Sequence, residues 1–330
     1  MIGTPSLDAR REAWFHSFLD ENHLNYRTSP AMVASPAQMK FMVYLEPGQN
    51  FYPCTERMFE EIMARVKSPI IGEKYNELWS RISSLIKKAI DDPARVDFIR
   101  DLLYIKFQHE TGNYNVIPSR VEKRLYKLFV VTTQVEDPFI EDKISRNQKA
   151  ADILNSADFI KAVNNIQGIQ DCLAPSPDLS LELLRRRIDA AKLRRLFQAS
   201  VQSSLWETNL PLPATDEWQK IFQRPVEGDG WEALENFLLT PAAGLAGHWV
   251  RRKILYLADK TGEIVFDLAA IQVMVSLGHT VILALKEAAY YHLVYLGDVV
   301  NDPTLKNMTR KAEVLTARNL TKNQLAASFR

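Results

Sequence analysis

The strand–helix–strand pattern over residues 253–286 constrains the fold of this chain most. "KILYLAD" (253–259) and "HTVILALK" (279–286) are short apolar runs with the length of buried strands. The segment between them, "GEIVFDLAAIQVMVSLG", is predicted to form a helix. A helix that connects two strands of one sheet predicts parallel pairing with a right-handed crossover. Ligands of open α/β sheets bind at the carboxyl ends of such strands, so we expect a site just after them.

The chain before this unit has a helical pattern. Apolar residues recur at helical spacing from about residue 6 to about residue 205, and the last of these segments is a long stretch at 180–206. Prolines and glycines between residues 207 and 231 interrupt the pattern. We therefore predict an α+β protein with a mainly helical domain at 1–225 and a short, truncated Rossmann-like α/β domain at 226–330. The segment "HLVYLGDVV" (292–300) is expected to add a third strand.

Charge and cysteine content argue against several classes of protein. The 41 basic residues balance the 40 acidic ones, and a net charge of +1 provides no overall attraction to nucleic acid or anionic membranes. The sequence has no apolar run long enough to span a membrane, and its N-terminus lacks the apolar core of a signal peptide. Cys54 and Cys172 have no metal-ligand spacing, and so few cysteines favour a cytoplasmic location.

Polar residues gather where the two predicted strands end. Asp259 ends the first strand and Lys286 ends the second, and the loop that follows carries Asp298, Asn301 and Asp302. Carboxylate oxygens are ligands of hard divalent cations, and a lysine can balance the charge of a phosphate. The sequence therefore predicts a cation and phosphate site at this edge of the sheet.

The turn after the first strand has two interpretations. Gly262 allows a tight turn, and the N–H groups at the start of the following helix could bind an anion. Asp259 could instead cap that helix and pair with Lys260, which is a purely structural role. The chain lacks GxGxxG and GxxxxGK[ST] patterns in this region, which argues against dinucleotide and P-loop sites.

Four segments carry motifs that occur together, in this order, in one enzyme family. They are "FYPC" (51–54), "VEDPFIEDKISRNQKA" (135–150), "KILYLADKTGEIVFD" (253–267) and "VILALK…VVNDPTL" (281–305). The third resembles the L-x-D-N-A-G-E-x-x-F-D motif of the damage-control phosphatase family with its ARMT-like domain. The others resemble that family's C-x-P-C element, its V-x-D-P-Y…S-N segment, and its strand lysine followed by I-N-D-x-T.

This resemblance implies a hydrolase that removes phosphate from small phosphorylated metabolites, with a divalent metal ion (Mn, Mg, Co, Ni or Fe) as Lewis acid. The site residues that it implies are the metal ligands Asp259 and Asp302, the catalytic neighbours Asn301 and Glu263, and the substrate-binding residues Asn147, Gly262 and Lys286. It also implies that Asn147 reaches the site from the helical domain.

The chain departs from the family pattern at the first of these ligands. Lys260 stands where the family has a metal-binding asparagine, and a protonated lysine repels a cation instead of ligating it. Phe51 replaces the first cysteine of the early element. The sequence ends soon after Asp302, so we expect part of the family's sheet and substrate pocket to be missing.

Three hypotheses stay open. In the first, the chain is a metalloenzyme in which Asp298 replaces the lost amide as a ligand, with phosphatase chemistry or a changed reaction on a small molecule. In the second, the chain is a metal-free enzyme relative or binding module in which Lys260 replaces the cation. Lys260 is then expected within ion-pair reach of Asp259 or Asp302. In the third, a homodimer or another partner covers the open edge of the short sheet.

Overall fold

The computed structural model divides the chain into two compact units, residues 1–138 and 139–330. The structure describes residues 69–112, 116–165, 181–208, 211–242 and 248–311. The helices predicted before residue 69, the "FYPC" element with Cys54, and Cys172 lie outside these ranges. The domain boundary predicted at residue 225 stays a prediction. It states that residues 1–225 and 226–330 fold as separate domains.

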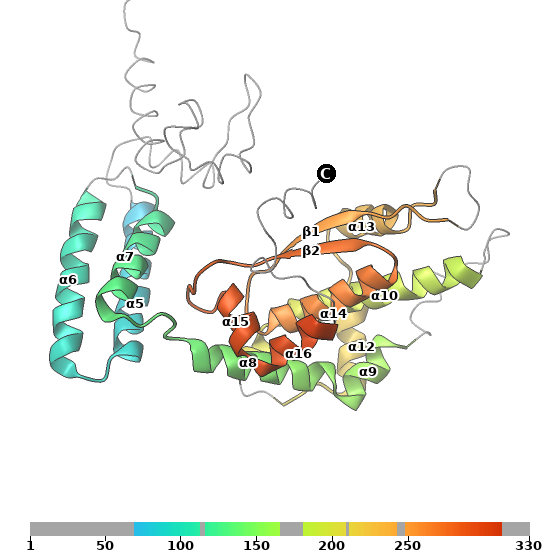
Figure 1. Ribbon diagram of the computed structural model, residues 1–330, viewed down its shortest axis with the longest axis horizontal. Helices are drawn as coiled ribbons and strands as arrows, with labels where there is room; N and C mark the ends of the chain where they lie inside the picture. The colour runs from blue at the N-terminus through green and yellow to red at the C-terminus, as the bar shows by residue number, and fades with distance from the viewer. Residues whose placement is uncertain (1–68, 113–115, 166–180, 209–210, 243–247, 312–330) are drawn as a thin grey trace, which may run out of the picture. The chain divides into compact units, whose positions relative to one another are not determined.

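The described part of the first unit is helical, as the sequence predicted. Helices α5 (Pro69–Ala89), α6 (Pro93–Gly112) and α7 (Pro118–Thr133) pack side by side (Figure 1). Helices α6 and α7 begin with Pro93 and Pro118, and proline suits the first helical turn because that turn has no partner for the missing N–H. Leu78 and Leu125 are fully buried between the helices. Apolar burial along one face of each helix holds this unit together.

The second unit contains a helical part followed by the sheet region. The helices before the sheet are α8 (Ile140–Leu154), α9 (Ala157–Val163), α10 (Leu181–Ser200), α11 (Ser204–Glu207), α12 (Thr215–Gln223) and α13 (Gly230–Leu238). The sheet region consists of β1 (Lys253–Leu257), α14 (Glu263–Ser276), β2 (Thr280–Ala284), α15 (Leu296–Asn301) and α16 (Pro303–Lys311). The described residues are therefore mostly helical, with a short α/β region, which is the predicted fold class.

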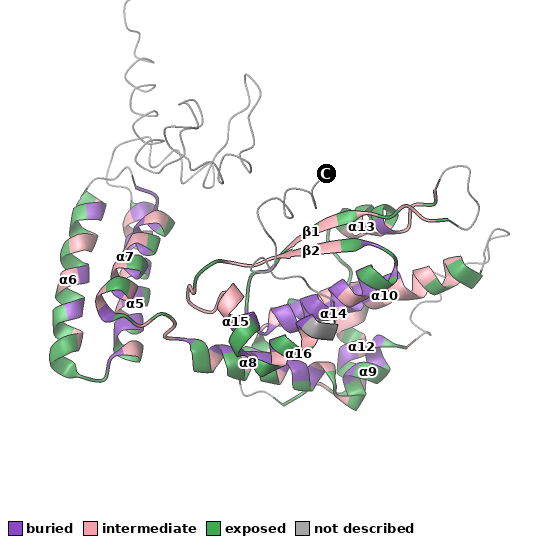
Figure 2. Cartoon of the chain, viewed as in Figure 1, coloured by how far each residue is buried: buried purple, intermediate pink, exposed green. Residues whose placement is uncertain are grey.

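The predicted strand–helix–strand unit is confirmed. β1 and β2 pair in parallel, with Lys253 opposite Thr280 and Leu257 opposite Ala284. The helix between them, α14, is buried along almost its whole length (Figure 2), which explains its nearly continuous apolar sequence. It packs against α10 and α8 as well as against β2. The carboxyl ends of both strands therefore meet at one edge, as parallel pairing requires.

The two faces of this short sheet have different environments. Ile254 and Val281, which are opposite each other, pack against the core of the second unit. On the other face, Leu255 is 52% exposed and Leu257 is 71% exposed among the described residues. Parallel sheets are normally covered on both faces, so this outer face is unusual. A homodimer or another partner that covers it stays a prediction.

The predicted third strand is wrong. Within 292–300, Leu293 and Tyr295 make only isolated bridges, and the chain then enters α15. The reason is local: the Asp298 carboxylate accepts a hydrogen bond from the N–H of Tyr295 at 2.9 Å, which caps the start of α15. A short helix therefore replaces the second half of the expected strand.

Within the described ranges, no helix has both the length and the apolar character needed to cross a membrane.

Candidate functional site

The shared carboxyl edge of β1 and β2 carries an ion pair. Asp259 and Lys286 each lie two residues beyond the end of their strand, and Lys286 Nζ is 2.9 Å from Asp259 Oδ1. Both side chains remain accessible, with 57% of the Asp259 side chain and 36% of the Lys286 side chain exposed. An exposed pair of this kind contributes at most about 1 kcal/mol to folding, so it leaves both groups available to a ligand.

Asn147 on α8 links this edge to a second carboxylate. Its side chain is fully buried, and its Nδ2 donates to Asp302 Oδ2 at 2.7 Å. Its Oδ1 accepts a hydrogen bond at 2.6 Å from the N–H of Gly262, which lies in the turn after Asp259. One amide therefore ties Asp302 to the turn that follows β1, although the two are far apart in the sequence.

Asp302 also caps a helix. Its Oδ1 accepts hydrogen bonds from the N–H groups of Thr304 at 2.8 Å and Leu305 at 3.4 Å, at the start of α16. Pro303 occupies the first helical position, where its missing N–H costs nothing. The sequence "NDPTL" therefore carries a helix-cap signal in addition to the predicted metal ligand. The cap fixes the position of a carboxylate that is 2% exposed.

A second buried pair lies one helical turn before Asn147. Lys143 Nζ is 3.3 Å from Asp298 Oδ2, and both side chains are almost fully buried. The Lys143 ammonium also lies over the Tyr295 ring, 4.6 Å from its centroid. Lys143 is not among the site residues that the sequence predicts. The signal that could have found it is the matched spacing of four residues in Lys143/Asn147 and Asp298/Asp302.

Gly262 is required at the turn for two reasons. Its φ is +83°, a left-handed conformation that glycine adopts without strain. A Cβ at this position would also overlap the indole ring of Trp206, which is buried on α11. The expected tight turn is thus present, but in this structure its N–H is bonded to Asn147.

Lys260 does not form the expected ion pair. Its side chain is exposed, and the cation that pairs with Asp259 is Lys286. Asp302, for its part, is bonded by the neutral amide of Asn147. No salt bridge joins Lys260 to Asp259 or Asp302 in this described region. The backbone of Lys260 instead forms an isolated antiparallel bridge with Leu293.

Two more acidic residues, Glu263 and Asp267, follow Asp259 in the sequence and lie on α14. Burial, followed by the charge of Asp259, raises the pKa of Glu263, while Lys260 acts in the opposite direction. Asp267 is 2% exposed and accepts a hydrogen bond from the Tyr256 hydroxyl at 2.7 Å. Burial is the largest cause and raises the pKa of Asp267 to about 7. The hydrogen bond from Tyr256 acts in the opposite direction, and the charges of Glu263 and Asp259 raise the pKa by smaller amounts.

The raised pKa of Asp267 predicts how stability changes with pH. The folded-state pKa of about 7 lies above the ordinary value of 3.8, so the native state holds this proton where the unfolded chain has lost it. The contribution of Asp267 to the free energy of unfolding should therefore fall as pH rises from about 4 to about 7. Urea denaturation of the wild type and Asp267→Asn across this range isolates the effect, because asparagine can still accept from Tyr256. Parallel pH profiles for the two proteins would contradict the prediction.

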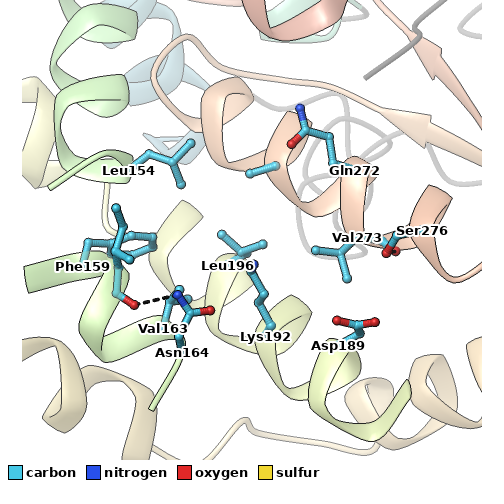
Figure 3. Close-up of a pocket in the computed structure, with 12 residues that line it drawn as sticks. Leu154, Phe159, Val163, Asn164, Asp189, Lys192, Leu196, Gln272, Val273 and Ser276 are labelled. Atoms are coloured by element: carbon cyan, nitrogen blue, oxygen red, sulfur yellow. Dashed lines mark hydrogen bonds between the residues drawn. The ribbon is translucent and has the colours of Figure 1, made fainter. Parts of the chain in front are cut away.

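A separate groove of about 480 Å³ lies between α9, α10 and α14 (Figure 3). Phe159 and Leu196 form part of its apolar lining, and Asp189 and Lys192 add charged groups. The α14 residues that line this groove lie between Ala269 and Ser276, and none of the predicted site residues lines it. The edge that carries Asp259 and Lys286 is thus distinct from this groove.

The sequence of residues 51–327 matches the family described as the damage-control phosphatase ARMT1-like domain. The chain belongs to this family. The resemblance drawn from the four motifs is thereby confirmed, and a small-molecule substrate fits a member of the damage-control phosphatase family. A crystal structure of a DUF89 family protein from Pyrococcus horikoshii is similar over 78% of this chain and 79% of that chain, with 17% identity and a TM-score of 0.48. A search of curated proteins found no match.

Damage-control phosphatases are generally metal-dependent, and two of the three predicted ligands of this member fit a hard cation. Asp259 uses one oxygen for Lys286, and its carboxylate is otherwise accessible. Asp302 is a buried carboxylate that accepts only from N–H groups of neutral residues in the part of the chain that the structure describes. Asp298 fits less well, because it is paired with Lys143.

This donor set suits a cation that is completed by substrate. Residues 69–112, 116–165, 181–208, 211–242 and 248–311 contain no group of three or more His, Cys, Asp or Glu side chains that could hold a metal ion by themselves. Mg²⁺-type ions are commonly held by one or two carboxylates together with water and substrate phosphate, so such an ion does not require a third carboxylate. Asn301, at the exposed end of α15, directly precedes Asp302.

Proposed function

We propose that this chain is a phosphomonoester hydrolase that acts on small phosphorylated metabolites with the help of a divalent cation. The observation that carries the proposal is the double hydrogen bond of Asn147, which ties Asp302 to the turn after Asp259. The amide thereby links the buried Asp302 carboxylate to the main chain three residues after Asp259. Asp259 and Asp302 are the pair that the family resemblance names as metal ligands.

In the proposed hydrolysis, the residues at this edge have different roles. Asp259 and Asp302 would hold the cation, which when bound supplies a Lewis acid for the phosphoryl oxygens. Lys286 and Lys260 would balance the remaining charge of the phosphate. Glu263 is half-buried and its raised pKa favours the protonated carboxyl, so it is suited to donate a proton to the departing oxygen. Asn301 would contact substrate beside Asp302.

A second candidate is a metal-free site that binds a phosphorylated metabolite without hydrolysing it. It is favoured by Lys260 at the family's asparagine position and by Lys286 already paired with Asp259. In this form the two ammonium groups replace the cation's charge. The chain would then be a binding module with the family's fold.

Metal content and activity distinguish the two candidates. Protein purified without chelator should hydrolyse p-nitrophenyl phosphate when Mg²⁺ or Mn²⁺ is added. Asp259→Asn should lower that activity by about 100-fold or more, as expected for loss of a metal ligand. Because Asp259 is exposed, the variant should keep its thermal midpoint. The matched control is Asp216→Asn on α12, which should change neither property.

Three other results would decide between the hydrolase and the binding module, or contradict both. Phosphate binding without metal uptake or hydrolysis would favour the binding module. Unchanged activity of Asp259→Asn would remove this carboxylate from the reaction. Absence of phosphate binding, with and without metal ions, would contradict both candidates.

A further inference from the structure

We propose that the ligand of this site carries a planar ring beside its phosphate, and that a row formed by Lys260, Leu293 and Tyr290 recognises it. This inference rests on the proposed function and deepens it by naming the substrate class. The phosphate would lie at the lysine end of the row, and the ring would stack on Tyr290. Aromatic or heteroaromatic phosphomonoesters are the class that fits.

The row follows from two isolated bridges. Leu293 pairs in antiparallel fashion with Lys260 on one side and with Tyr290 on the other. Residues directly opposite each other in an antiparallel pair point to the same face, so these three side chains share a face. Lys260 is exposed, and Leu293 and Tyr290 are partly exposed. At about 4.8 Å between neighbouring segments, the row places Tyr290 about 10 Å from Lys260 at the backbone.

The loop that carries Tyr290 is bonded to the edge that carries the site. The N–H and the hydroxyl of Thr261 both donate to the carbonyl of His292 at 3.0 Å. The N–H of Val294 donates to the carbonyl of Asp259 at 2.9 Å, and the N–H of Leu296 donates to that of Lys286 at 3.0 Å. The aromatic loop is therefore held in place beside Asp259 and Lys286 by main-chain hydrogen bonds.

A tight turn at the tip of this loop runs from Tyr290 to Leu293 and has Tyr291 inside it. The N–H of Leu293 donates to the carbonyl of Tyr290 at 3.1 Å, and between them Tyr291 has a φ of +48°. A left-handed conformation is costly for a residue with a side chain, so the surrounding packing must stabilise it. The Tyr290 and Tyr291 rings meet edge to face at 4.9 Å, and the Tyr291 ring lies 5.7 Å from that of Phe139. This packing orients the Tyr290 ring.

The chemistry of the row selects among phosphate esters. A lysine attracts the phosphate of any ester, so it does not discriminate between them. A tyrosine face stacks on aromatic rings, and stacking of one ring commonly changes affinity by about tenfold or more. The replacement of the family's asparagine by Lys260 places a charge at one end of this row. Esters without a planar ring would use only that end.

The test measures binding rather than turnover. Three probes are titrated calorimetrically into the full chain with Mg²⁺ and without it: inorganic phosphate, propylphosphonate and benzylphosphonate. The C–P bonds of the two phosphonates resist phosphatases, so binding is separated from reaction. The wild type should bind benzylphosphonate about tenfold more tightly than propylphosphonate. Tyr290→Ala should abolish this preference, and Tyr290→Phe should keep it.

Two controls make the result specific. Tyr290→Ala should lose more affinity for benzylphosphonate than for inorganic phosphate, and Tyr104→Ala on α6 should leave all three affinities unchanged. Equal affinity of the wild type for the two phosphonates would overturn the inference and leave the proposed function in place. Equal losses for phosphate and benzylphosphonate in Tyr290→Ala would also overturn it. Failure of all three probes to bind would overturn both proposals.

Discussion

Replacing Lys143 with methionine is expected to lower the free energy of unfolding by about 3–5 kcal/mol, the cost of removing one partner from a buried ion pair. The Lys143 and Asp298 side chains are 1% and 4% exposed, so water cannot take over the solvation of the remaining carboxylate. Methionine has a similar length and fills the space, which removes the charge without creating a large cavity. Urea denaturation followed by circular dichroism measures the difference.

The double variant Lys143→Met/Asp298→Asn is the matched control. Asparagine keeps an oxygen that can accept from the N–H of Tyr295, so the cap of α15 is retained while both charges are removed. Replacing a buried ion pair as a whole is often nearly neutral, so the double variant should recover most of the lost stability. A loss below about 1 kcal/mol in Lys143→Met would show that Asp298 does not depend on this ammonium.

Asn147→Ala is expected to lower the free energy of unfolding by about 3 kcal/mol and to abolish phosphate binding. The substitution removes the 2.7 Å hydrogen bond to Asp302 and the 2.6 Å hydrogen bond from Gly262. Both partners are buried, and a buried polar group without a partner costs about 1–3 kcal/mol. Asp302 and the turn after Asp259 would also lose their link, so calorimetric titration with inorganic phosphate should detect the functional loss.

The neighbouring position on α8 provides the control for this prediction. Gln148 is exposed, and its side chain bonds the hydroxyl of Thr304 at 3.1 Å, so Gln148→Ala should change stability by less than about 0.5 kcal/mol. Asn147→Asp separates the two hydrogen bonds, because its oxygen can accept from Gly262 but its charge opposes that of Asp302. Wild-type phosphate affinity in Asn147→Ala would show that the link to Asp302 is not needed for binding.

Much of the site lies on elements that the sequence alone predicts. The strands that precede Asp259 and Lys286 follow from short apolar runs, and the helix after Gly262 follows from its long apolar segment. Parallel pairing places both strand ends at one edge, so the proximity of Asp259 and Lys286 was predictable. The contribution of Asn147 was implied only by the family resemblance.

Local sequence determined the elements, and tertiary packing determined their partners. Apart from its four-residue spacing to Asn147, nothing near Lys143 distinguishes it from the exposed lysines of the chain, and its partner Asp298 lies 155 residues away. The same separation divides Asn147 from Asp302. The predicted third strand failed for a different, local reason, since the capping hydrogen bond of Asp298 outweighs the strand preference of its apolar neighbours.

The sequence by itself determined the strand–helix–strand unit, the helical character of the described segments between residues 69 and 206, and the family of the protein. These follow from the period of apolar residues and from short motifs, which act over a few residues. Only the tertiary structure decided that Lys286, and not Lys260, pairs with Asp259, and that Asp302 is held by an amide. The physical reason is that hydrogen bonds and ion pairs depend on distances of a few ångströms, which are set when α8 packs against α14 and α16.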